Sequence, residues 1–135
     1  MRKLLLVIAL CAVLPGCAVW DAYNMTKYDP NEYRIITEIR TEARRFKKEC
    51  DNPLLSRPNA WAMADKTELF EVYSENVPNN NNTIKSSKEL NSIAQGLADR
   101  YRQPTLPGAV FCKIKFDSIE TNASTMQRVI GNKPR

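Results

Sequence analysis

The sequence predicts an all-α fold: a small up-down bundle of about four helices, pinned by one disulfide bond, that follows a cleaved signal peptide. Three observations lead to this fold class. A short apolar segment opens the chain, four later segments space their apolar residues as helices do, and two cysteines flank the middle of the chain. The length of 135 residues leaves room for one domain with a single modest core.

The N-terminal segment is typical of an export signal. Arg2 and Lys3 precede an unbroken apolar run over residues 4–13. A helix of about ten residues spans roughly 15 Å, which is about half of a bilayer's hydrocarbon core, so this run is too short to be a stable membrane span. We therefore expect it to be removed by cleavage.

The sequence Leu-Pro-Gly-Cys at residues 14–17 resembles the lipobox of bacterial lipoprotein precursors. The resemblance extends only through Ala18. It implies that Cys17 receives a diacylglyceryl group, that cleavage occurs just before it, and that its new amino group is acylated with a fatty acid such as palmitate. The expected organisation is a lipoprotein signal peptide over 1–16, a lipidated tether over 17–28 and a helical periplasmic domain over 29–135.

The same resemblance implies a location. An aspartate directly after the lipidated cysteine often retains such proteins in the inner membrane, and Ala18 occupies that position here. We therefore expect the periplasmic face of the outer membrane. An ordinary secreted protein is the alternative, because Pro15 is less usual in a lipobox than Ala, Ser or Thr. That alternative would leave Cys17 as an odd thiol.

Aromatic residues occur along the expected tether. We interpret Trp20 and Tyr23 as membrane-interface residues, since rings with one polar end favour the headgroup region. The equal alternative is that these rings, together with Tyr28, cover the domain's own core.

The first helix is expected from Asp29 to about Cys50. Asp29 followed by Pro30 and Glu32 is typical of an N-cap, an N1 proline and a capping box. Apolar residues then recur in steps of three and four, at Ile36, Ile39, Ala43, Phe46 and Cys50.

A second helix is expected to open near Ser56 and to run to about Asn76. We expect it to turn an aromatic-rich face to the core, with the residues Trp61, Ala62, Leu69, Phe70 and Tyr73. The polar run from Pro78 to Asn82 then predicts an exposed turn.

The third helix is expected over about Ile84 to Tyr101, with Gly96 costing about 1 kcal/mol relative to alanine. Pro104 to Gly108 ends it. The fourth helix spaces its apolar residues as the first does, at Cys112, Phe116, Ile119, Ala123, Met126 and Ile130, and ends at Gly131. A strand over Val110 to Phe116 is the main alternative.

The two remaining cysteines test this topology. In an up-down bundle the end of the first helix lies beside the start of the fourth, which brings Cys50 and Cys112 together. That alignment also sets Phe46 opposite Phe116. A disulfide closing so long a loop would contribute roughly 4 kcal/mol in the chain-entropy model. Two reduced thiols or a redox pair are the alternative.

Charge and composition limit the classes of function that this chain could have. Cleavage removes two of the twenty basic residues, so the net charge falls from +5 to +3, which is too mild to indicate nucleic-acid binding. The sequence contains no histidine, the commonest general base and metal ligand. We therefore expect no enzyme, no metal and no cofactor, and we identify no small-molecule substrate.

The favoured function is a non-enzymatic envelope interaction module, attached to the membrane by its lipid and binding another envelope protein. Lipoproteins of this size resemble bacterial accessory lipoproteins, and also those encoded by phages and plasmids, which gives two alternatives. One is the outer-membrane subunit of a spanin-like lysis pair, and the other is a receptor-blocking lipoprotein of superinfection exclusion. The basic run from Arg44 to Lys48 could touch headgroups or a partner, or could be an ordinary solvated helix face.

Overall fold

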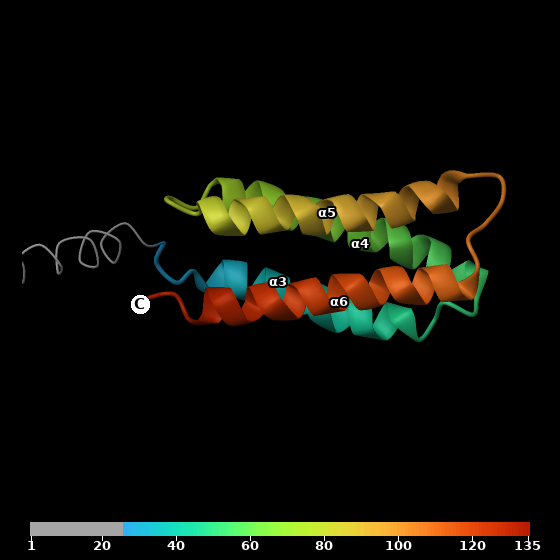
Figure 1. Ribbon diagram of the computed structural model, residues 1–135, viewed down its shortest axis with the longest axis horizontal. Coiled ribbons are helices and arrows are strands. Elements are labelled where there is room, and N and C mark those ends of the chain that lie inside the picture. The colour runs from blue at the N-terminus through green and yellow to red at the C-terminus, as the bar shows by residue number, and fades with distance from the viewer. Residues whose placement is uncertain (1–25) are drawn as a thin grey trace, which may run out of the picture.

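The computed structural model describes residues 26–135, and within that range the chain forms four helices and no strand. They are α3 (Pro30–Lys47), α4 (Pro53–Glu75), α5 (Asn81–Arg102) and α6 (Ala109–Gly131). Figure 1 shows them lying side by side along the long axis of the bundle. The most extensive packing joins α3 to α6 and α4 to α5, and the pairs α5 with α6 and α3 with α4 complete the bundle. The predicted all-α bundle is confirmed.

Two helices begin with the same local arrangement. The Asp29 side chain accepts hydrogen bonds from the backbone N–H groups of Asn31 and Glu32, and the Asn52 side chain accepts one from Leu54. A proline follows each cap at the first helical position, where its missing N–H removes no helical hydrogen bond. Each cap therefore fixes where its helix starts.

The predicted start of the second helix was wrong by three residues. Asn52 and Pro53 end the preceding turn and also open α4, so Ser56 is already helical and Pro58 lies inside the helix. Pro58 is exposed and sits less than two turns from the helix start. A proline there removes one hydrogen bond to a carbonyl that water can reach, and α4 continues through it.

A regular spacing of buried positions unites the core. On each helix one stripe of buried residues follows alternating steps of three and four, the seven-residue repeat of helices that pack nearly parallel, and Ile35, Ala64 and Ala98 are buried beside these stripes. The stripes are Glu32, Ile36, Ile39, Ala43 and Phe46 on α3; Ser56, Ala60, Met63, Thr67, Phe70 and Ser74 on α4; Thr83, Ser87, Leu90, Ala94, Leu97 and Tyr101 on α5; and Cys112, Phe116, Ile119, Ala123, Met126 and Ile130 on α6.

The predicted core face of the second helix was also wrong in part. Phe70 is fully buried and Tyr73 packs against the core, but Trp61, Ala62 and Leu69 are exposed. The buried stripe of α4 consists mostly of small or polar residues. The larger apolar side chains of Trp61 and Leu69 lie one position away from this stripe. The apolar pattern in the sequence therefore predicted burial for a side of the helix that faces solvent.

The disulfide predicted between the first and fourth helices is confirmed. Cys50 and Cys112 are bonded, with their Cα atoms 5.7 Å apart, in the turn after α3 and in the first turn of α6. One layer further in, the rings of Phe46 and Phe116 meet edge to face with centroids 5.7 Å apart. Because residues 109–131 are helical, the alternative strand over Val110 to Phe116 is excluded.

The packing around two glycines gives a test of helix stability. A Cβ added at Gly96, in the middle of α5, would meet no atom within 4 Å, so Gly96→Ala should raise the free energy of unfolding by about 1 kcal/mol. At Gly131 a Cβ would lie 3.1 Å from Cε2 of Tyr33, so Gly131→Ala should gain clearly less. Urea denaturation followed by circular dichroism measures both. Equal gains would contradict this account.

Candidate functional site

A charged cluster is buried at the end of the bundle where the described chain begins. Glu32 of α3 is fully buried, and its carboxylate accepts hydrogen bonds from Nζ of Lys133 at 2.7 Å and from Nδ2 of Asn80 at 2.6 Å. Lys133 also donates to Oδ1 of Asn80 at 2.8 Å, and Asn80 donates to the Ser74 carbonyl at 3.1 Å. Three segments far apart in the sequence therefore meet in one polar network.

The cluster corrects two sequence predictions. Glu32 does not complete a capping box at Asp29, because its side chain turns inward to Lys133 and Asn80. Asn80 was expected in an exposed turn but is only 2% exposed. Burying a charge costs much less when it is paired and hydrogen-bonded, and this network supplies both conditions.

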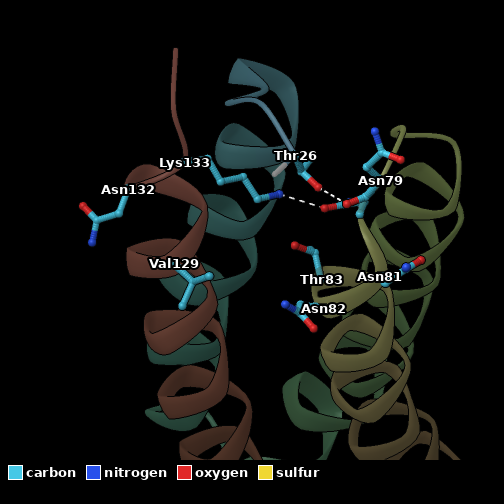
Figure 2. A pocket seen from close by; sticks show the side chains of 9 residues that line it. Thr26, Asn79, Asn81, Asn82, Thr83, Val129, Asn132 and Lys133 are labelled. Carbon is cyan, nitrogen blue, oxygen red and sulfur yellow. Dashed lines mark hydrogen bonds between the residues drawn. The ribbon is translucent and has the colours of Figure 1, made fainter. Parts of the chain in front are cut away.

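A pocket of about 580 Å³ opens beside this cluster, between the start of α5 and the end of α6. Its walls come from Thr26, from Asn79 to Thr83, and from Val129, Asn132 and Lys133. Figure 2 shows Lys133 reaching across from the α6 side toward the α5 side. A smaller cavity of about 200 Å³ adjoins it along α5 and α6 and shares Asn82, Thr83 and Val129.

Both ends of the described chain are fixed at this end of the bundle, as Figure 1 shows. The Tyr28 amide donates to the Pro134 carbonyl at 2.8 Å, and the Tyr28 ring packs against Tyr33. The Tyr73 hydroxyl donates to both carboxylate oxygens of Asp29. Burial, and then the Asp29 carboxylate, raise the pKa of Tyr73. The described chain therefore begins beside the pocket, at Thr26.

The residues singled out by the sequence lie in different places. Cys17, Trp20 and Tyr23 fall outside the described residues. Cys50 and Cys112 lie at the bundle end far from the pocket.

Ion pairs account for much of the basic run from Arg44 to Lys48. Arg44 and Lys47 pair with Glu120 on α6, and Lys47 also pairs with Asp117. The hydrogen bond from Arg44, together with Lys47, lowers the pKa of Glu120. These side chains join α3 to α6 on a solvated face, which favours the structural interpretation of the run.

The outward side of α4 carries several exposed apolar side chains, as does α6 at Val110, Ile114 and Val129. Leu54 is 84% exposed, Leu69 56% and Val72 52%, and Trp61 is 37% exposed with Arg57 stacked 4.9 Å above its ring. Asp65 and Glu68 are also exposed on this side and form no ion pair with residues 26–135. We refer to Leu54, Trp61, Asp65, Glu68, Leu69 and Val72 as the α4 outer stripe.

Other kinds of site receive little support from the described residues. Residues 26–135 bring no three His, Cys, Asp or Glu side chains into a group that could hold a metal ion. Over the same range no helix has the length and apolar character needed to cross a bilayer. Comparison with family models, curated proteins and solved structures finds no match to this chain.

The buried polar cluster could have been found in the sequence. Glu32 lies four residues before Ile36, and so continues the buried stripe of α3 by one turn. Asn80 and Thr83 likewise extend the stripe of α5 backward from Ser87 and Leu90. A prediction of burial from apolar side chains alone misses polar residues that share the same spacing.

The Glu32–Lys133 pair gives a second stability test. Lys133→Met should destabilise the fold by about 3–5 kcal/mol, because it leaves the Glu32 carboxylate buried without a counter-ion. The double variant Glu32→Gln, Lys133→Met removes both charges and should lose less stability than Lys133→Met alone. Urea denaturation with the disulfide intact measures the difference. A double variant no more stable than Lys133→Met would show that charge burial is not the cause.

Proposed function

We propose that this chain is an outer-membrane lipoprotein, acylated at Cys17, whose helical body binds a second envelope protein without catalysing a reaction. The observation that carries the binding role is the α4 outer stripe, where large apolar side chains face solvent next to unpaired carboxylates. Exposed apolar residues that continue along one face mark an interaction surface more often than isolated ones do.

The arrangement of the chain supports attachment by its N-terminal side. Thr26 is nine residues after Cys17, a stretch that can reach at most about 30 Å. Because Thr26 lies at one end of the bundle, an acyl group on Cys17 would hold that end close to the bilayer. The helices would then present the α4 outer stripe along their length to neighbouring proteins.

The composition of the stripe indicates the partner's chemistry. Leu54, Trp61, Asp65, Glu68 and Val72 follow one another in steps of seven, four, three and four, so they form one line along α4. A partner helix with an apolar face flanked by lysine or arginine would bury the apolar residues and pair with the two carboxylates.

The anchor is tested by labelling cells with radioactive palmitate. The full chain should incorporate the label and sediment with outer membranes, and Cys17→Ser should abolish both because the acylated thiol is gone. Cys11→Ser, which changes the cysteine inside the expected signal peptide, is the matched control and should leave labelling intact. Label retained in Cys17→Ser would exclude this attachment.

The binding surface is tested separately by photocrosslinking in intact cells. A benzophenone side chain at Leu69 of the full chain should give one discrete crosslinked product, and a second substitution, Val72→Glu, should reduce its yield by about tenfold, the effect of losing roughly 1.4 kcal/mol. The same probe at Ile114, which is 61% exposed on α6, is the control. Equal products from both positions would contradict a specific surface on α4.

A further inference from the structure

The first turn of α5 points unpaired hydrogen-bond donors at the pocket. The earliest helical hydrogen bond of α5 runs from the Ile84 amide to the Asn80 carbonyl, and no side chain caps the helix. The amides of Asn81, Asn82 and Thr83 therefore have no partner inside the helix. All three residues line the pocket. The N-terminus of a 22-residue helix also attracts negative charge.

A buried side chain independently indicates a ligand at this place. Thr83 is only 5% exposed, yet its hydroxyl forms no hydrogen bond with residues 26–135. Figure 2 shows this hydroxyl pointing toward the space between α5 and α6 that the pocket occupies. Within residues 26–135 only the Ser74 hydroxyl is a fully buried side-chain group without a partner, so the Thr83 hydroxyl is reached from the pocket, where a bound group could form its hydrogen bond.

The cation of the buried cluster adds a third feature. Lys133 uses two of its three N–H donors, on Glu32 and Asn80, and its ammonium group borders the pocket with one donor remaining. None of the residues within 26–135 that line this pocket or the adjoining cavity is acidic. The nearest carboxylate is that of Glu32, which lies behind the Lys133 ammonium at 2.7 Å and offsets its charge, so the remaining Lys133 donor acts mainly as a hydrogen-bond donor.

We propose that this pocket binds a phosphate group. Its oxygens would accept from the amides of the first α5 turn, the Thr83 hydroxyl and the remaining Lys133 donor. The adjoining cavity has apolar walls at Met126, Val129 and Ile130 of α6 and polar side chains at its other lining positions, which are Asn82, Thr83, Ser86 and Thr125. It offers space for an apolar substituent of the same ligand, so a phospholipid headgroup suits the site better than free phosphate does.

The proposal does not depend on acylation of Cys17, because every group that would hold the phosphate lies in residues 80–133. It can therefore be tested on the full chain carrying Cys17→Ser. Failure of the anchor would leave the result unchanged, and failure of the pocket would leave the palmitate experiment unchanged.

The test follows the backbone amides by two-dimensional NMR during three titrations. The probes are sodium phosphate, dihexanoyl phosphatidylglycerol below its micellar concentration, and octyl glucoside as an uncharged amphiphile. We expect saturable shifts of the Asn81, Asn82 and Thr83 amides with the phospholipid, weaker shifts with phosphate, and none with the glucoside. Shifts with phosphate alone would retain the phosphate site and overturn the lipid source.

Matched variants separate specific binding from general charge effects. Val129→Glu places a carboxylate at the pocket rim and should weaken phospholipid binding more than tenfold, whereas Val110→Glu makes the same change on an exposed site near the far end of α6 and should have no effect. Thr83→Val should weaken binding about fivefold by removing one hydrogen bond. The proposal is overturned if no probe shifts the α5 amides, or if both glutamate variants weaken binding equally.

Discussion

The fold depends on one constraint, the alternating three- and four-residue spacing of buried positions on all four helices. Because this spacing keeps one stripe of each helix on the bundle axis over its whole length, every residue on a stripe is buried whatever its chemistry. Ile36, Leu90 and Ile119 meet that condition as ordinary core residues. The same spacing also buries three polar residues, Glu32, Asn80 and Thr83. Their polar groups need hydrogen-bond partners at the positions where the spacing puts them.

The two ends of the bundle meet this constraint in different ways. At one end Cys50 and Cys112 close the interface between α3 and α6 covalently, with Phe46 and Phe116 packed next to them. At the other end the same interface contains the buried carboxylate of Glu32, which needs Lys133 as its counter-ion. Buried ion pairs add little net stability, but sliding α6 along α3 would leave Glu32 without Lys133. The pair therefore opposes a change of register.

Much of this could be predicted from the sequence, because local signals agreed with the tertiary structure. Asp29 and Pro30 marked a helix start, and the stripes on the first and last helices placed Cys50 beside Cys112. The prediction failed at positions where a polar residue is buried or an apolar residue is exposed. Ser56 and Thr67 are buried on α4 while Trp61 is exposed, and only the packing of neighbouring helices decides between those two sides.

The exposure of large apolar side chains on α4 also connects the fold to the proposed binding role. Small side chains such as Ala60, Ala64 and Ser74 fill much of the inner side of the helix, so apart from Met63 and Phe70 the core takes its larger apolar groups from the other helices. Leu54, Leu69 and Val72 then contribute little to the buried core of residues 26–135, and each exposes apolar area to water. Burying such a side chain gains about 1.5–3 kcal/mol. A protein that covered the stripe would gain part of this free energy at each exposed side chain, against the cost of association.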